Sequence, residues 1–309
     1  MNNLHQHVSL RPYTTFQIGG PADYFYGASD TAQTIDVLQW AREQKLPVLI
    51  LGGGSNVLIP DDGFRGLVLQ PQFKALHIAG GEVIVGSGMQ LSELIHQTLA
   101  HGLVGLEFLA GIPGTVGGAV VGNAGTYGIV IASVVTMLEY IDLDTRQIEE
   151  KLVEEITFGY RDSSLKKQNS MLTAVSFQLT TGDVTASQKL IDERLAVRAA
   201  KHPHEPSAGC IFKNIIMSQT DLTKIITEGL DIQQFEKYDK IPAGFLIEQC
   251  GLKGFHIGGA QVSPQHANYI VNTGKATAED VIKLISLIKQ KVRDTYGIQL
   301  QEEVRIIFN

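Results

Sequence analysis

The sequence predicts an α+β fold, in which helices follow strands but several strands also pair as hairpins. Three observations support this prediction. The first 70 residues read as strand, helix and strand; residues 76–85 read as two strands around a glycine turn; and a long amphipathic helix near the C-terminus precedes a closing strand. The chain has 309 residues, 44% of them hydrophobic, which is enough for two or three domains.

The first region reads as a helix between two strands. Asp30 or Ser29 is placed to cap the helix, and Ile35 and Leu38 fall on one side of it. The residues after the helix form an uninterrupted apolar run, which is typical of a strand buried on both faces. We expect strands at 23–27, 47–51 and 66–69, and the helix at 31–45.

The second region begins near Pro71 and contains a stretch without charge. Residues 108–138 carry no charged side chain, and a membrane-spanning helix needs only about 20 apolar residues. Seven glycines and Pro113 break helices, however, so we interpret this stretch as a buried glycine-rich loop system that ends in a strand. A membrane span is the weaker interpretation. The other elements expected are a hairpin at 76–85, a helix at 91–101, and strands at 134–143 and 172–179.

The third region follows a connecting helix at 187–201, which the segment His-Pro-His-Glu-Pro at 202–206 should stop because proline cannot continue a helix. We therefore predict three domains: 1–70, 71–203 and 204–309. Thr277 and Asp280 are spaced as a capping pair for the last helix. The expected elements are strands at 210–213, 258–262, 268–272 and 300–308, and helices at 221–228, 242–250 and 278–296.

Composition excludes several classes of function. Acidic residues outnumber basic ones by 32 to 25, for a net charge of −7, which disfavours nucleic-acid binding. The two cysteines, Cys210 and Cys250, form no C-x-x-C pair, which fits a reducing compartment. The nine histidines show no metal-binding spacing, so we expect no metal site. No basic segment followed by an apolar one opens the chain, and we expect a cytoplasmic protein without a signal peptide.

A glycine-rich loop follows the buried strand at 47–51. Glycine lets successive N–H groups converge on an anion such as a pyrophosphate, and two polar side chains here add donors. A strand follows the loop, so it is not the Rossmann fingerprint, which opens a helix. From this loop alone, a tight turn between strands is an equally good interpretation. The candidate residues are Gly52, Gly53, Gly54, Ser55 and Asn56.

A second glycine-rich segment strengthens the binding interpretation. Two uncharged segments of this kind can line one long crevice, as a dinucleotide requires; the alternative is close packing of backbones in a core. The candidate residues are Gly111, Ile112, Pro113, Gly114, Gly117 and Gly118, extended by Asn123, Ala124 and Gly125.

Three further segments carry residues that can do chemistry. Arg161, in Phe-Gly-Tyr-Arg-Asp-Ser, can stabilise an enolate, although a surface pair with Asp162 is the better interpretation from sequence alone. Cys210 can donate a proton, because a free thiol has a pKa of about 8.5; the alternative is a small buried apolar residue. Glu303 and Arg305 share one face of a strand, where they can reach a site or form a surface pair.

In their order along the chain, these segments resemble the UDP-N-acetylenolpyruvoylglucosamine reductase family, whose members are also called UDP-N-acetylmuramate dehydrogenases. The resemblance runs from about residue 13 to residue 307, and it rests on the joint order of the motifs rather than on one of them. They are YTTFQIGGPA at 13–22, LGGGSNVL at 51–58, GIPGTVGGA at 111–119 with NAG at 123–125, FGYRDS at 158–163, SAGCIFKN at 207–214, HANYIVN at 266–272 and EVR at 303–305.

The resemblance implies a vanillyl-alcohol oxidase-like FAD-binding fold of two subdomains, followed by a C-terminal α+β domain that closes the substrate site. FAD is bound non-covalently, NADPH supplies electrons, and the enolpyruvyl ether of UDP-N-acetylglucosamine is reduced. The length matches the shorter subclass. We expect a monomer with no nucleic-acid or membrane partner. The alternatives are another FAD-dependent oxidase of this fold, acting on a sugar or alcohol, and a nucleotide-binding protein that has lost catalysis.

The resemblance also assigns roles to individual residues. Arg161 and Glu303 stabilise the enolic intermediate, and Cys210 protonates it; the family usually has serine at this position, so the pH profile and the sensitivity to oxidation are in doubt. Arg305 contacts the flavin or orients Glu303. The glycine segments hold FAD, and the residues assigned to the substrate are Tyr160, Lys213, Asn214 and Asn268.

Overall fold

The computed structural model describes residues 3–308, and it confirms the predicted α+β class. The chain forms two compact units. The first unit contains Met1–Val8, Ala22–Gly53 and Phe64–Ala200, and the second contains Ser9–Pro21, Gly54–Gly63 and Lys201–Asn309. Two short segments from the first 63 residues therefore belong to the C-terminal unit. The three predicted domains remain a prediction, although the boundary near 203 lies close to the break after Ala200.

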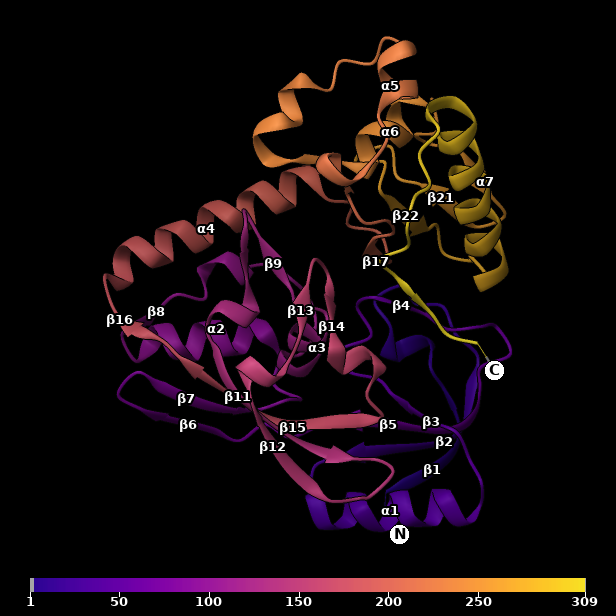
Figure 1. The fold of residues 1–309 in the computed structure, drawn as a ribbon. Coiled ribbons are helices and arrows are strands. Elements are labelled where there is room, and N and C mark those ends of the chain that lie inside the picture. Colours follow the sequence, from indigo (N-terminus) through magenta and orange to yellow (C-terminus); the bar gives the residue numbers. More distant parts are fainter. Residues whose placement is uncertain (1–2, 309) are drawn as a thin grey trace. The chain divides into compact units, whose positions relative to one another are not determined.

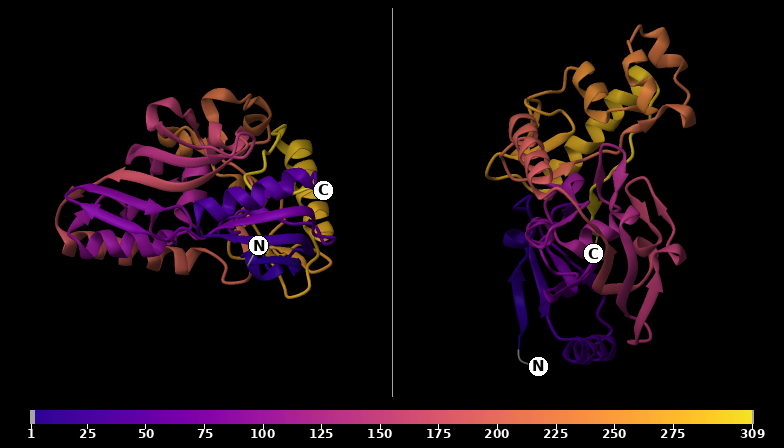
Figure 2. Two further views of the ribbon diagram at one scale, coloured as in Figure 1. Left: turned by 90° about the horizontal axis from the view of Figure 1, so that it is seen from below. Right: turned by 90° about the vertical axis from the view of Figure 1, so that its left-hand side faces the viewer.

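One sheet of the first unit has the strand order β1-β2-β5-β3, and β2 and β3 both pair with β5 in parallel. Helix α1 packs on it through Val37 and Leu38, which share a buried core with Leu67 and Leu69 (Figures 1 and 2). Asp30 caps the helix as predicted, since its Oδ1 accepts from the Gln33 N–H at 2.8 Å. The bounds are β1 Leu4–Ser9, β2 Pro21–Ala28, α1 Thr31–Glu43, β3 Val48–Ile50 and β5 Phe64–Pro71. Strand β1 was not predicted.

The second sheet of this unit is antiparallel, with the order β12-β11-β15-β7-β6. Its core is formed by Val85, Leu138 and Phe177, together with Leu94 of α2 and Val120 of α3. The predicted hairpin and the helix after it are confirmed, and β12 is an unpredicted fifth strand. The bounds are β6 Leu76–Ala79, β7 Glu82–Gly86, α2 Leu91–Ala100, α3 Val116–Val121, β11 Val135–Asp142, β12 Ile148–Leu152 and β15 Ser170–Gln178.

The uncharged stretch at 108–138 folds differently from the predicted loop system, because it contains the short helix α3. Glycine is unfavourable in a helix, but here it permits close packing: a Cβ on Gly117 would lie 2.9 Å from the Cβ of Ser87. The buried side chains of Val116 and Val120 hold α3 in the core. Among the described residues, no helix is both long and apolar enough to cross a membrane.

Helix α4, Val184–Lys201, begins three residues before the predicted helix and ends at the predicted residue. The helix stops here because Pro203 disfavours helical geometry in the residue before it.

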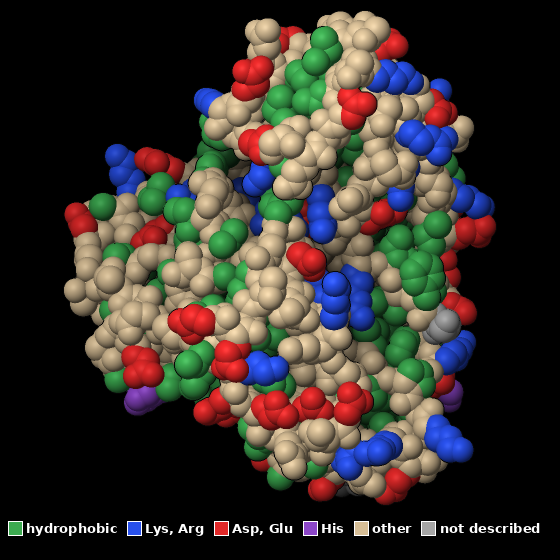
Figure 3. Space-filling model, viewed as in Figure 1, with side chains coloured by type: hydrophobic (Ala, Val, Ile, Leu, Met, Phe, Trp, Pro, Cys, Tyr) green, Lys and Arg blue, Asp and Glu red, His purple; other side chains and the backbone are tan. Residues whose placement is uncertain are grey.

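On the face shown in Figure 3, acidic side chains gather over the lower part, where Figure 1 draws β11 and β12.

The second unit is built on the antiparallel sheet β17-β22-β21-β20. Helix α7 packs on it through Val281, Leu284 and Ile288, in one core with Val262 and Ile270. The predicted capping pair of α7 is confirmed: Thr277 Oγ1 accepts from the Asp280 N–H, and Asp280 Oδ2 accepts from the Thr277 N–H. The bounds are β17 Ser207–Cys210, α5 Thr223–Thr227, α6 Ala243–Gln249, β20 His256–Ile257, β21 Ala260–Val262, β22 Tyr269–Asn272 and α7 Ala278–Tyr296.

The closing strand is shorter than predicted. Only β23, Arg305–Ile306, is a strand, and it pairs in parallel with β4, Val57–Leu58. The residues before it instead bond to the segment after β17, as described below. The remaining short strands are β8 Leu103–Val104, β9 Gly125–Thr126, β10 Ile129–Val130, β13 Phe158–Gly159, β14 Asp162–Ser163, β16 Thr180–Thr181, β18 Ile215–Ile216 and β19 Lys240–Ile241.

Candidate active site

The two glycine-rich segments meet in the first unit. A Cβ on Gly53 would lie 2.7 Å from the Cα of Gly114, and a Cβ on Gly52 would lie 2.9 Å from the Oγ1 of Thr115. Side chains at Gly52 and Gly53 would therefore push the segments apart. Glycines about 60 positions apart in the sequence thus lie side by side, as is required if both segments line one dinucleotide-binding crevice.

The first glycine segment passes from one unit to the other between Gly53 and Gly54. Gly54 has φ +62°, and a Cβ there would collide with the carbonyl oxygen of Tyr13, so only glycine fits. Strand β4 follows directly, which confirms that this is not the strand-loop-helix fingerprint.

In the second segment, several backbone N–H groups are already used. The Val116 N–H donates to the Met89 carbonyl and the Gly117 N–H to the Ser87 carbonyl, both at 2.9 Å. The Gly118 N–H donates to Thr115 Oγ1, which caps α3. These three groups are thus bonded within the protein, and for Gly117 and Gly118 the structure favours the close-packing interpretation.

Asn123 lies between these loops and the hairpin that carries Arg161. Its side chain is 3% exposed, and its Nδ2 donates to the Gly159 carbonyl at 2.8 Å. Its Oδ1 is buried and has no hydrogen-bond partner within residues 3–308. A buried acceptor without a donor costs roughly 1–3 kcal/mol. The donor groups of FAD, such as its ribityl hydroxyls and flavin N–H, are of the kind that this oxygen lacks, so the site fits the cofactor.

Side chains of helix α4 contact the second glycine-rich segment and the turn after it. The Arg194 guanidinium lies 4.8 Å from the centre of the Tyr127 ring, and a Cβ on Gly111 would lie 2.6 Å from Cδ of Arg198. Tyr127 has φ +55° and Gly128 has φ +84°, as the two central residues of the β9–β10 turn. The sequence alone does not single out Arg194 and Arg198, although their spacing of four residues places them on one face of the helix.

Glu107 links α4 to the loop before the second glycine segment. Both of its carboxylate oxygens accept from the Gly105 N–H at 3.0 Å. Burial alone would raise the pKa of Glu107, but hydrogen bonds from Ser187 and Gly105 and the charge of Arg194 bring this pKa below its ordinary value. The carboxylate is thus held in its charged form beside α4.

Arg161 occupies a two-residue turn between β13 and β14, with Tyr160 before it. Its φ is +54°, and its guanidinium lies 5.8 Å from the Tyr160 ring centre. Lys166 forms an ion pair with Asp162, at 3.5 Å. The Asn123–Gly159 bond ties the hairpin that carries Arg161 to the second glycine-rich segment.

In the second unit, Glu303 lies between two segments that were also predicted to form the site. Its N–H donates to the Ile211 carbonyl at 2.7 Å, next to Cys210. Its carbonyl accepts from Asn56 Nδ2 at 3.1 Å, and the Arg305 N–H donates to the Asn56 carbonyl at 3.0 Å. Ile211, which follows Cys210, thus belongs to one hydrogen-bonded network with Glu303 and Asn56.

The residues predicted to bind substrate surround the same network. Asn268 is buried and bonds the backbone of Phe212 twice, with Oδ1 accepting from its N–H at 3.0 Å and Nδ2 donating to its carbonyl at 2.9 Å. Asn214 Oδ1 accepts from the Ala243 N–H at 3.2 Å, at the start of α6. The Lys213 N–H donates to the Gln301 carbonyl at 2.9 Å. Asn268 therefore shapes the segment after Cys210.

The structure places the predicted residues in two groups. Arg161, Tyr160 and the glycine segments up to Gly53 and at 111–125 belong to the first unit. Cys210, Glu303 and the other candidates belong to the second. The described part of the chain contains no group of three His, Cys, Asp or Glu side chains that could hold a metal ion.

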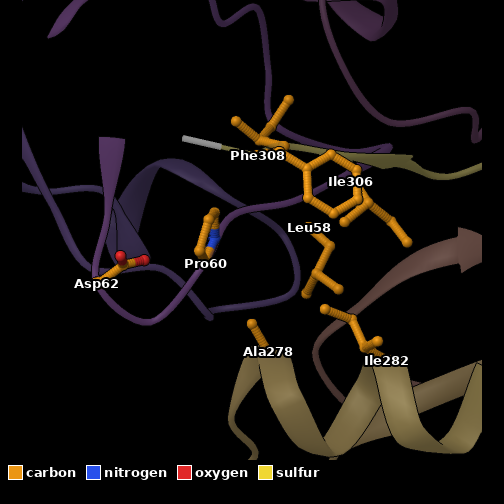
Figure 4. Close-up of a pocket in the computed structure, with 8 residues that line it drawn as sticks. Leu58, Pro60, Asp62, Ala278, Ile282, Ile306 and Phe308 are labelled. Atoms are coloured by element: carbon orange, nitrogen blue, oxygen red, sulfur yellow. The ribbon is translucent and has the colours of Figure 1, made fainter. Parts of the chain in front are cut away.

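A cavity of about 220 Å³ lies elsewhere in the second unit and contains no predicted site residue (Figure 4). Apolar side chains from β4, the start of α7 and the C-terminal strand point into it, with Asp62 at its edge. Its lining is mostly apolar and has few groups that could take part in catalysis, so we do not assign the active site to this cavity.

Comparisons with known proteins identify the family of this chain. Residues 22–149 match the FAD binding domain, and residues 201–307 match the C-terminal domain of UDP-N-acetylenolpyruvoylglucosamine reductase. The reductase of Heliobacterium modesticaldum is 38% identical over 98% of this chain and 90% of its own length. That of Chlamydia muridarum is 40% identical over 99% of this chain and 95% of its own. The crystal structure of the Thermus caldophilus reductase has a TM-score of 0.78 at 30% identity and covers 98% of both chains.

Proposed function

Because the chain belongs to the UDP-N-acetylenolpyruvoylglucosamine reductase family, we propose that it reduces the enolpyruvyl ether of UDP-N-acetylglucosamine to UDP-N-acetylmuramate, with FAD as cofactor and NADPH as reductant. The observation that carries this proposal is the network in which the backbones of the Cys210 and Glu303 segments bond each other and Asn56. A proton donor, a carboxylate and a cofactor segment then serve one reaction. In this proposal the product is a precursor for peptidoglycan synthesis, and the enzyme is a cytoplasmic monomer.

FAD, when bound, supplies a carrier that takes two electrons from NADPH and delivers them to the substrate as a hydride. Gly52–Asn56 and the segment at 111–125 hold it non-covalently, with Asn123 Oδ1 accepting one hydrogen bond. The protein's part is to hold the enol ether in place and to exclude water from it. The three predicted domains divide this work, with residues 204–309 closing over the substrate.

Hydride addition at C3 of the enolpyruvyl group places negative charge on C2 and its carboxylate. We assign the stabilisation of this charge to the Arg161 guanidinium and to Glu303, and the protonation of C2 to the Cys210 thiol. Lys213 and the amide N–H groups of Asn214 hold the UDP pyrophosphate. Since Asn214 Oδ1 is already bonded to α6, its Nδ2 remains the group to face a phosphate. Tyr160 and Asn268 line the substrate site, and Arg305 faces the flavin.

The direct test is the absorbance spectrum of the purified protein. We expect flavin bands that NADPH bleaches and that the enolpyruvyl UDP-sugar restores without oxygen. Cys210→Ala should bind FAD and be bleached by NADPH, but should lose at least about 100-fold in the rate at which the UDP-sugar restores the bands. Cys250→Ala is the matched control and should behave as the wild type.

Two results would contradict the proposal. A protein without flavin bands under all loading conditions lacks the cofactor. A protein whose bands return rapidly with oxygen, but not with the UDP-sugar, is an oxidase of the same fold. Normal turnover by Cys210→Ala would remove only the thiol from the mechanism and leave the reaction in place.

A further inference from the structure

The proposed reaction consumes one proton in each turnover, in addition to the hydride. If Cys210 delivers this proton to C2, its sulfur is left as a thiolate and must be protonated again before the next cycle. The proton that restores the thiol must come from solvent, and the path inferred for it rests on the proposed function.

Tyr269 lies directly opposite Cys210 in the sheet. The two residues are paired partners on β17 and β22, and the Ile211 N–H donates to the Asn268 carbonyl at 2.8 Å beside them. Partners in an antiparallel pair project from the same face of a sheet, with Cβ atoms about 4.5–5.5 Å apart. The Tyr269 side chain, which is 7% exposed, therefore stands on the same side as the thiol.

The hydroxyl of Tyr269 bonds a histidine that reaches toward the surface. His202 Nδ1 lies 2.5 Å from Tyr269 Oη, and the two ring centres are 5.3 Å apart. His202 follows α4 directly and is half-buried. A half-buried histidine is thus bonded to the residue that pairs with Cys210.

A second histidine completes the cluster but plays another part. The His266 ring stacks on His202 at 5.5 Å and contacts the Tyr269 ring at 4.9 Å. Its Nδ1 accepts from the Asn268 N–H at 3.2 Å, a role that requires this nitrogen to be unprotonated. Burial and the nearby Lys253 lower the pKa of His266, against the smaller opposing effects of its own backbone and Glu248. The neutral form of His266 is therefore favoured in this cluster.

We propose that His202 and Tyr269 return a proton from solvent to the Cys210 thiolate. Before the transfer, the His202 Nδ1–H donates to the tyrosine hydroxyl, and Nε2 has the lone pair that takes a proton from solvent. When Nε2 is protonated, Nδ1 passes its proton to Tyr269 Oη, and Tyr269 releases its hydroxyl hydrogen toward the sulfur, directly or through one water molecule. The transfer ends with a neutral thiol, a neutral tyrosine and a neutral imidazole that carries its hydrogen on Nε2, and one proton has entered. Proton exchange with solvent then returns the imidazole to its Nδ1–H form.

The experiment separates the first turnover from later ones. Stopped-flow mixing of NADPH-reduced enzyme with the enolpyruvyl UDP-sugar uses a thiol that is already protonated. His202→Gln keeps a hydrogen-bond partner for Tyr269 but cannot carry the proton, and Tyr269→Phe keeps the ring without the hydroxyl. We expect both variants to match the wild type within about two-fold in the first turnover and to lose at least about ten-fold in kcat.

Chemical rescue and a matched control complete the test. Free imidazole should restore several-fold of the lost kcat of His202→Gln and leave the wild type unchanged, which a merely structural role would not produce. His204→Gln, an exposed histidine two residues away, is the control and should keep the wild-type kcat. If Tyr269→Phe does not fold, the results for His202→Gln alone test the proton path.

The failures are distinguishable. Wild-type kcat in His202→Gln, or an equal loss in the first turnover and in kcat without rescue, would overturn the proton path while leaving the reductase function standing. A wild-type protein that never reduces the UDP-sugar would instead overturn the proposed function.

Discussion

Asn123 and His266 show how burial determines what a single polar side chain can do. Both are largely shielded from water, and each uses one atom to hold backbone. Asn123 keeps a second atom, Oδ1, without a donor among the described residues, which is why it points to a ligand. His266 instead has its charged form disfavoured by burial, so its protonation weakens the fold.

This gives a pH dependence of stability with a definite sign. The folded pKa of His266 lies below its ordinary value of 6.5, so near and below pH 6.5 the unfolded chain binds more protons than the folded one. Stability should therefore fall as the pH drops through 6.5 and level off below the folded pKa. Urea unfolding of the wild type at pH 7.5 and at pH 5.5 should show this loss.

His266→Asn tests the assignment, because a short amide can still accept from the Asn268 N–H but does not titrate. Its unfolding free energy should change less between the two pH values than that of the wild type. An equal change in both proteins would show that other groups, not His266, set the slope.

At the level of elements, the glycine segments are held at a fixed separation by their own backbones. Gly53 packs on Gly114, Gly117 packs on Ser87, and Arg198 of α4 packs against Gly111. Such contacts leave no space for a methyl group, and a rigid backbone cannot yield as a flexible side chain does.

Gly53→Ala should therefore separate the two segments. Overpacking of this kind costs roughly 1–3 kcal/mol, and we expect FAD affinity to fall at least ten-fold, measured by flavin fluorescence. Gly80→Ala is the control: its φ is +60°, so the change brings about 1–2 kcal/mol of backbone strain, but nothing lies within 4 Å of the new Cβ. It should lose stability and keep FAD. Wild-type FAD affinity in Gly53→Ala would contradict the shared crevice.

At the level of the whole molecule, the predicted cofactor segment belongs to both units, since the chain changes unit between Gly53 and Gly54. A ligand that binds this segment in the folded chain, and not in the unfolded chain, stabilises the folded state. The second unit in turn depends on this N-terminal segment: Asp61 accepts from the Ala278 and Glu279 N–H groups at the start of α7, at 2.9 and 3.3 Å.

FAD added to the apoprotein should therefore raise the melting temperature. At a concentration 100 times its Kd, it contributes about 2.7 kcal/mol, which corresponds to roughly 5–11 °C for a domain of about 150–250 residues. FMN lacks the second phosphate and the adenosine, so at equal concentration its effect should be smaller. Scanning calorimetry of the apoprotein with each flavin measures both shifts. Equal shifts would show that the glycine segments do not bind a pyrophosphate.

Local patterns predicted much of the fold. The capped helix at 278–296 and the apolar strand before Gly52 are dictated by neighbours within a few residues, and both are confirmed. Strand β12 was missed because Ile148–Leu152 carries three charges in five residues and is recognised only by its pairing with β11. Helix α3 was missed because its glycines are tolerated only through distant contacts.

The candidate site divides in the same way. The residue types of the glycine segments, Cys210 and Glu303, and their order along the chain, sufficed to name the family and the chemistry. Only the tertiary structure decided that the N–H groups of Gly117 and Gly118 are already occupied, that Asn268 holds Phe212, and that Tyr269 pairs with Cys210 across two strands and bonds His202. The physical reason is that hydrogen-bond occupancy and cross-strand pairing join residues tens of positions apart, and no periodicity within one segment records its partner.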